Sequence, residues 1–142
     1  MTDTPGKIHH INFLVKDLDQ AEASYRGLLG LPPGIREELP ARGVLTARFR
    51  VGDTWLVLLQ PTTDEGEPAR HLREQGEGFF LISFGVDDLD AAIDRVTAAG
   101  GRISGAGPRC GLAGWRIVDI DAADTFGAQL QLTEDVRGSG AE

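Results

Sequence analysis

At the start of the chain, the order of apolar and polar residues predicts a strand followed by a helix. Residues 8–15 are rich in β-branched and aromatic side chains and contain no glycine or proline, so they predict a strand. Apolar residues then recur at helical spacing, with Asp17 or Asp19 as the expected N-cap. Gly30 is expected to end this helix, because glycine readily adopts the left-handed conformation that follows helix C-termini.

A hairpin and a polar connector are predicted next. Residues 44–51 and 54–60 have the composition of two strands, and the Gly52-Asp53 pair between them predicts a tight turn. Residues 63–78 are rich in proline, glycine and charged residues, which is typical of a connector. A short helix is expected inside it, at residues 69–75.

The second half of the chain starts the same order again. Residues 79–86 predict a strand, and the capped helix that follows is expected to end at Gly100. Residues 101–114 form a glycine-rich loop. Residues 115–121 and 128–133 predict two further strands.

The two halves are an internal repeat. Residues 10–19 match residues 81–90 position by position, and residues 56–59 correspond to residues 130–133. A single module would leave an apolar sheet face exposed, whereas two modules can bury it together. We therefore predict an α+β fold in which two tandem βαβββ modules form a curved mixed sheet with a concave pocket.

Charge and cysteine content exclude several classes of protein. The chain has 142 residues and a formal net charge of −8, which disfavours nucleic acid and anionic membrane surfaces as main partners. A single cysteine, Cys110, allows no internal disulfide and suits a cytoplasmic protein. We expect no membrane helix and no signal peptide, and we expect a disordered tail at residues 136–142.

Segments that span nearly the whole chain resemble the vicinal-oxygen-chelate superfamily, which includes glyoxalase I, extradiol dioxygenases and drug-binding resistance proteins. The connector that ends Gly-Glu-Gly and the Pro-Arg-x-Gly-x-x-Gly loop are most similar to the methylmalonyl-CoA epimerase branch. The resemblance implies one glyoxalase-like domain over residues 1–142, with modules at about 7–62 and 79–134. It is carried by residues 7–30, 51–63, 68–78, 80–102 and 108–132.

The resemblance also implies a set of four metal-ligand positions, one on each of four strands. His10 matches the first ligand, but Val57 stands at the second and Leu81 at the third. Gln131 stands at the fourth, where the family has a glutamate. Divalent metals of this class need several imidazole or carboxylate ligands. We therefore predict that the chain holds no catalytic metal and needs no other cofactor.

A different alignment would place Gln60 at the second ligand position. An odd step of three residues from Val57 puts Gln60 on the other face of a regular strand, which disfavours this alternative. The resemblance further implies a catalytic carboxylate in the second strand region, where Ala41 stands in this chain. A metal-stabilised enolate flanked by glutamates is therefore not expected.

Strand alternation from the four positions predicts a mostly apolar pocket with a few polar groups. His10 and Gln131 are the expected catalytic residues, because His10 can exchange a proton near neutral pH and an amide can support it. Arg109, in the glycine-rich loop, is either a contact to an anionic part of the ligand or a surface arginine. The residues expected to bind substrate are Asn12, Trp55, Val57, Leu81, Ser83, Arg109, Trp115 and Gln129.

Two functions remain open at this point. The first is a metal-independent isomerase or epimerase, lyase or cyclase that moves a proton on a small carbonyl or acyl-thioester metabolite, with His10 as acid or base. The second is a non-catalytic protein that binds or sequesters an apolar or aromatic small molecule, similar to the resistance proteins. The retained loop and connector favour the enzyme. A homodimer is expected from the resemblance.

Overall fold

The structure, a computed structural model, describes residues 4–134, so the tail predicted at residues 136–142 lies outside the described residues. The chain forms two compact units. The N-terminal unit comprises His10–Phe80, and the C-terminal unit comprises Met1–His9 together with Leu81–Glu142. The unit boundaries at His10 and Leu81 coincide with matched positions of the internal repeat.

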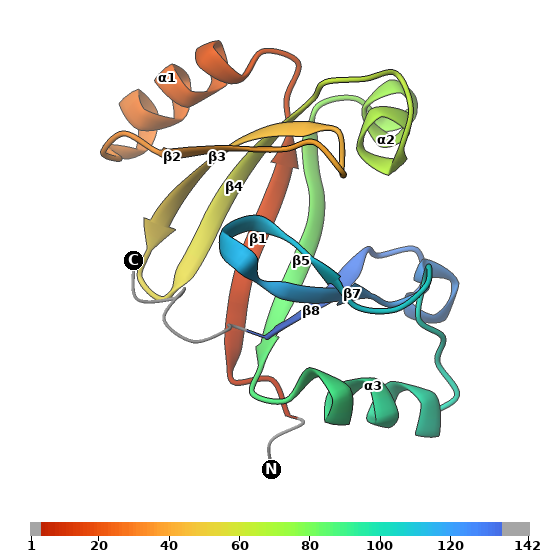
Figure 1. The fold of residues 1–142 in the computed structure, drawn as a ribbon. Helices are drawn as coiled ribbons and strands as arrows, with labels where there is room; N and C mark the ends of the chain where they lie inside the picture. Colours follow the sequence, from red (N-terminus) through yellow and green to blue (C-terminus); the bar gives the residue numbers. More distant parts are fainter. Residues whose placement is uncertain (1–3, 135–142) are drawn as a thin grey trace. The chain divides into compact units, whose positions relative to one another are not determined.

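The N-terminal unit contains a mixed sheet and two helices (Figure 1). Its strands lie in the order β2-β3-β4-β1. β1 runs parallel to β4, and the other neighbours are antiparallel. Its elements are β1 (Lys7–Leu14, whose first residues belong to the other unit), α1 (Leu18–Leu29), β2 (Ile35–Leu39), β3 (Val44–Val51), β4 (Thr54–Pro61) and α2 (Glu67–Gln75).

The C-terminal unit repeats this arrangement. Its strands lie in the order β5-β8-β7-β6, with β5 parallel to β8 and the other pairs antiparallel. The predicted α+β glyoxalase-like fold of two repeated modules with mixed sheets is therefore confirmed. Its elements are β5 (Gly78–Val86), α3 (Leu89–Ala98), β6 (Arg109–Cys110), β7 (Arg116–Asp119) and β8 (Leu130–Glu134), with 3₁₀ turns at Leu112–Gly114 and Ala122–Thr125.

The two repeated helices begin in the same way. Asp17 caps α1 by accepting from the backbone N–H of Gln20 at 3.1 Å, and Asp88 caps α3 by accepting from that of Ala91 at 3.1 Å. These carboxylates satisfy N–H groups that have no partner inside the helix. The predicted aspartate cap is confirmed, with Asp17 rather than Asp19 in that role.

A side chain from the last strand of each module completes the helix start. Gln60 accepts from the backbone N–H of Leu18 at 2.7 Å, and Glu134 accepts from that of Leu89 at 2.8 Å. Gln60 therefore points toward α1, on the strand face that the sequence predicted for it. Its amide oxygen supports the helix rather than a metal.

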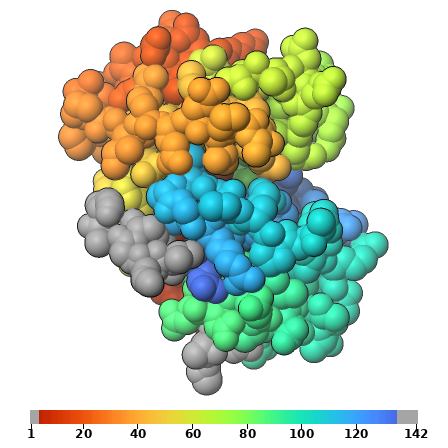
Figure 2. Space-filling model, viewed as in Figure 1, coloured from red at the N-terminus to blue at the C-terminus, as the bar shows by residue number. Residues whose placement is uncertain are grey.

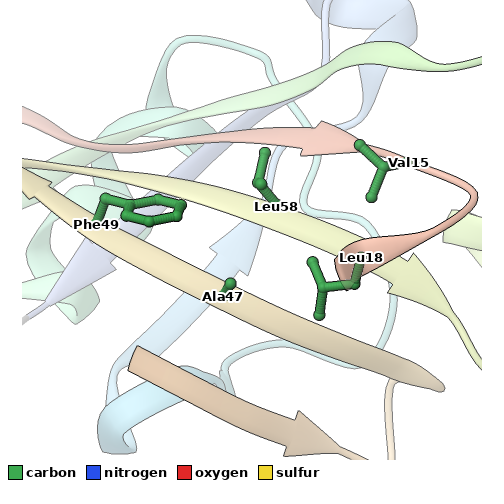
Figure 3. Packing of buried hydrophobic residues seen from close by; sticks show 5 residues of the cluster. All are labelled: Val15, Leu18, Ala47, Phe49 and Leu58. Atoms are coloured by element: carbon green, nitrogen blue, oxygen red, sulfur yellow. The ribbon is translucent and has the colours of Figure 1, made fainter. Parts of the chain in front are cut away.

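Each unit has its own hydrophobic core between the sheet and its first helix. In the N-terminal unit Leu18 of α1 packs with Ala47, Phe49 and Leu58 of β3 and β4, as Figure 3 shows. In the C-terminal unit the corresponding cluster contains Val86, Leu89, Ala92, Val118 and Leu132. Burial of these apolar side chains provides most of the stabilisation. None of the helices in residues 4–134 has the length and apolar character needed to cross a membrane.

Strand β2 was not predicted from the sequence, because its residues do not alternate as those of a half-buried strand do. Arg36 and Glu38 are exposed, and the orange segment that contains β2 lies on the surface in Figure 2. β2 is the edge strand of its unit, where charged side chains discourage pairing with other chains. The two-residue strand β6, which also lies at a sheet edge, was likewise predicted as loop.

A partly buried ion pair between Glu22 and Arg36 fixes β2 to α1. Glu22 of α1 accepts from the backbone N–H of Gly34 at 2.8 Å and from Nε of Arg36 at 2.7 Å. Burial raises the pKa of Glu22, but these hydrogen bonds and the positive charge of Arg36 outweigh burial and hold that pKa below its usual value. The edge strand is thus placed by charge as well as by the ladder to β3.

Replacement of Leu58 by alanine should lower the free energy of unfolding by about 2–5 kcal/mol, because it leaves a cavity in the core of the N-terminal unit. Urea denaturation followed by circular dichroism measures this change. Leu28→Ala is the matched control, since Leu28 is 82% exposed and its loss should change the free energy by less than about 0.5 kcal/mol. Equal effects of the two substitutions would contradict the assigned core.

Candidate functional site

One face of the N-terminal sheet carries its polar residues. Phe13 of β1, and Val15 just after the strand, pack in the hydrophobic core, so His10 and Asn12, in the alternate positions of β1, lie on the opposite face. We call this opposite face the polar face of the unit. His10 is in register with Trp55 on β4, and Trp55 is in register with Arg50 on β3.

Two arginines surround the indole of Trp55 on this face. The guanidinium carbons of Arg48 and Arg50 lie 5.3 Å and 4.9 Å from the centre of the Trp55 ring system. Trp55 and Arg48 are buried, so their contact is a cation–π interaction in a partly desolvated setting, whereas Arg50 is exposed. Arg48 also donates from Nη1 to the carboxylate of Glu37 on β2 at 2.7 Å. Two positive charges and one negative charge therefore share the polar face.

Asn12 places a buried hydrogen-bond acceptor on the same face. It is in register with Val57, which is itself in register with Arg48. The side-chain oxygen Oδ1 of Asn12 is buried and has no hydrogen-bond partner in the part of the chain that the structure describes. Buried polar atoms are normally paired with protein, water or ligand. The Asn12 oxygen is therefore a candidate ligand contact, as the sequence predicted for this residue.

The C-terminal unit has a polar face of the same kind. Val118 and Leu132 pack in its core, so the alternate residues of β7 and β8 lie on the opposite side. Ser83 of β5 is in register with Gln131, and its hydroxyl oxygen lies 2.5 Å from that of Thr133. All three side chains are buried. The neighbouring Leu81 is buried as well.

Gln131 is held in place by Asp119. The Gln131 side chain donates from Nε2 to Oδ1 of Asp119 at 3.0 Å, and these residues are in register between β8 and β7. The second oxygen of Asp119 accepts from Nη1 of Arg109. The Gln131 oxygen Oε1 is buried without a hydrogen-bond partner among residues 4–134. Arg109 thus contacts Gln131 through Asp119.

The glycine-rich loop borders a hollow of about 280 Å³ next to Trp115. Trp115 itself is almost fully buried, and the ring of His9 meets its indole edge-on at a centroid distance of 4.5 Å. Gln129 precedes β8, is half-buried, and its backbone oxygen accepts from the N–H of Ile82 at 3.2 Å. The hollow is lined by Pro108, Arg109, Cys110, Gly114, Trp115 and Arg116.

Comparison with known proteins identifies the family. The profile of the glyoxalase/bleomycin resistance protein/dioxygenase superfamily matches residues 9–118. The chain belongs to this superfamily. The match begins within β1, includes His10 and ends within β7, so it covers most of both modules.

Several curated relatives are epimerases. The chain is 25% identical over 130 residues to the mitochondrial methylmalonyl-CoA epimerase of Bos taurus, a match that covers 91% of this chain and 74% of the relative. It is 33% identical over 93 residues to the ethylmalonyl-CoA/methylmalonyl-CoA epimerase of Cereibacter sphaeroides, covering 64% of this chain and 69% of that protein.

A solved structure agrees with these relatives. The methylmalonyl-CoA epimerase of Streptomyces coelicolor, in complex with 2-nitronate-propionyl-CoA, matches with a TM-score of 0.90 and 29% identity. The match covers 94% of this chain and 99% of that one. The predicted resemblance to the methylmalonyl-CoA epimerase branch is thereby confirmed.

The residues at the superfamily's ligand positions do not fit a divalent metal. Val57 and Leu81 are buried apolar side chains, and neither can donate an electron pair. His10 and the amide oxygen of Gln131 are the two donors left at these positions, fewer than a divalent metal of this class needs. Within residues 4–134 no three histidine, cysteine, aspartate or glutamate side chains are grouped so as to hold a metal ion. We therefore derive no chemical step through a metal.

Sequence reasoning missed three residues that contact the predicted ones. Arg48 and Arg50 alternate along β3 and so share a strand face, but only the register with Trp55 shows that this face also carries His10. Asp119 was not singled out, although it alternates with the core residue Val118 and therefore faces away from the core, where it meets Gln131 across the ladder. Pairing between strands decides both cases, and a single sequence does not reveal it.

Incubation with Zn²⁺, Co²⁺, Ni²⁺ or Mn²⁺, followed by dialysis and elemental analysis, should leave clearly less than one metal ion per chain. The physical reason is the loss of two of the four ligand positions at Val57 and Leu81. Cys110→Ser serves as the control, because an exposed thiol can retain zinc by itself. A stoichiometric metal that persists in this variant would contradict the account.

Proposed function

We propose that the chain is a metal-independent isomerase of the epimerase type, which moves a proton at the carbon beside the carbonyl of a small acyl thioester or related metabolite. The observation that carries the proposal is the buried imidazole of His10 on a sheet face that also bears Arg48 and Arg50. The epimerases named above support the reaction class, and one of them binds an acyl-CoA analogue.

In this proposal His10 acts as the acid and base. Imidazole is the side chain that exchanges protons most readily near neutral pH. Its neutral nitrogen takes the proton from the carbon beside the thioester carbonyl, and the C–H electron pair moves onto the carbonyl oxygen to form an enolate. The imidazolium then returns a proton to that carbon, and the carbonyl re-forms. Return on the opposite face of the carbon gives the other epimer.

The enolate needs positive charge nearby, and the arginines supply it in this proposal. Arg48 is 8% exposed and lies against both Trp55 and Glu37, so its guanidinium is fixed before a ligand binds. Preorganised charge in a dry site stabilises a developing anion more than flexible charge in water does. Arg50 adds a second guanidinium beside the same ring. In this proposal the two guanidinium groups stabilise the enolate, as a metal ion does in the metal-dependent members of the superfamily.

The second function, binding without chemical change, is supported by a different observation. The superfamily's ligand positions are occupied by Val57 and Leu81, and both tryptophans are buried beside polar groups. A site of that kind can bind an apolar or aromatic metabolite without reacting with it. Binding with no turnover in the experiment below would favour this alternative over the isomerase.

Replacement of His10 by alanine should lower the rate of methylmalonyl-CoA or ethylmalonyl-CoA epimerisation at least about 100-fold, because it removes the general acid and base. The reaction is followed by circular dichroism of the single epimers with enzyme pretreated with chelator. His71→Ala is the matched control: this histidine lies on α2, where its ring packs on Phe80. The control should retain turnover.

Thermal unfolding of both variants establishes that they are folded. Turnover by a folded His10→Ala protein at the wild-type rate would show that His10 is not the acid or base. Loss of wild-type turnover on chelation, restored by adding metal, would overturn metal independence.

A further inference from the structure

The partly buried chain of hydrogen bonds from Arg109 through Asp119 to Gln131 fixes which atom Gln131 presents to a ligand. A carboxylate at neutral pH accepts hydrogen bonds and donates none. Asp119 can therefore bind the Gln131 amide only through its nitrogen, as the 3.0 Å contact between Nε2 and Oδ1 shows. The other Asp119 oxygen is occupied by the guanidinium of Arg109.

The side-chain atom of Gln131 that this chain of hydrogen bonds leaves for a ligand is therefore the oxygen Oε1. Gln131 is 2% exposed, and its Oε1 has no hydrogen-bond partner in the described part of the chain. The hydroxyl groups of Ser83 and Thr133 contact each other, and neither is bonded to this oxygen in the described part of the chain. A buried acceptor without a partner costs free energy, which a suitable ligand group would recover.

The orientation of the Gln131 amide also determines which ligand groups are disfavoured next to Oε1. A carbonyl, carboxylate or enolate oxygen placed against Oε1 would bring two acceptors together. A hydroxyl, amide or ammonium group would instead donate to it. A glutamate, as the superfamily has at this position, would carry charge beside Asp119, whereas the amide is neutral and can bond to it.

We propose that Asp119 is a positioning residue that makes Gln131 an acceptor site for a hydrogen-bond donor of the ligand. The ligand class that fits this acceptor carries a hydroxyl group, and, resting on the proposed function, a hydroxyacyl thioester is the form tested below. Gln131 contacts that hydroxyl, and Asp119, backed by Arg109, holds the amide in the orientation that accepts from it.

The test compares two thioesters that differ in one hydroxyl group, lactoyl-CoA and propionyl-CoA. Titration monitored by tryptophan fluorescence should show that the wild-type protein binds lactoyl-CoA about five- to tenfold more tightly, the value of one neutral hydrogen bond. Asp119→Asn should reduce this ratio to about one, because an asparagine permits either orientation of the Gln131 amide. Gln131→Met, which removes the acceptor at similar size, should do the same.

Asp90→Asn is the matched control. Asp90 also pairs with an arginine of the C-terminal unit, Arg116, but does not contact Gln131. This variant should keep the wild-type preference for lactoyl-CoA. If Asp119→Asn does not fold, the Gln131→Met ratio decides the question. A wild-type protein that binds both thioesters equally would overturn the inference.

A second readout separates this inference from the proposed function. In ¹⁵N-labelled protein, the Gln131 side-chain NH₂ should give a resonance shifted by its bond to the carboxylate, and Asp119→Asn should abolish that shift while Asp90→Asn preserves it. Failure of both thioesters to bind with the shift intact would overturn the ligand assignment and leave only the positioning role of Asp119. Absence of the shift in the wild-type protein would overturn the positioning role of Asp119.

Discussion

The alternation of side chains along a β-strand is the constraint on which the whole molecule depends. Each strand must supply apolar residues to a core on one face, and it is then free to carry other chemistry on the opposite face. In β1 the residue that packs on the core is Phe13, followed by Val15 just after the strand, and the alternate positions are His10 and Asn12. A shift of one residue in strand register would move the core residues to the polar face and the polar residues into the core. The register that packs the core therefore also places the candidate site.

Duplication of the module extends this constraint to both units. Helix α1 and helix α3 begin with equivalent aspartate caps, and each receives a side chain from the last strand of its own module. The polar faces have nevertheless diverged. One carries His10 with two arginines around Trp55, and the other carries the amide of Gln131 fixed by Asp119. The shared scaffold thus supports different chemistry in its two halves.

The sequence predicted most of the fold because the signals for its elements are local. Strand composition, the aspartate caps and Gly30 placed the repeated strands and helices within a few residues of their observed bounds. Strand β2 was not predicted because it is an edge strand with charged residues, and β6 was not predicted because it has only two residues. Tertiary pairing, not local propensity, makes those segments strands.

Prediction of the site was less complete for the same physical reason. Strand parity alone placed His10 with Asn12 on one face and Gln60 on the other. The partners that give these residues their properties come from distant strands, as Asp119 does for Gln131. Family resemblance supplied the ligand positions, and the residues present at Val57 and Leu81 then argued against a metal.

The central claim is proton transfer beside a thioester carbonyl without a metal. It is tested most directly by incubating chelator-treated wild-type protein with methylmalonyl-CoA in D₂O and following the mass of the recovered thioester. The account predicts enzyme-dependent uptake of one deuterium at the carbon beside the carbonyl, at an unchanged rate after chelation. Tight binding of the thioester with no deuterium uptake above the protein-free rate would contradict it.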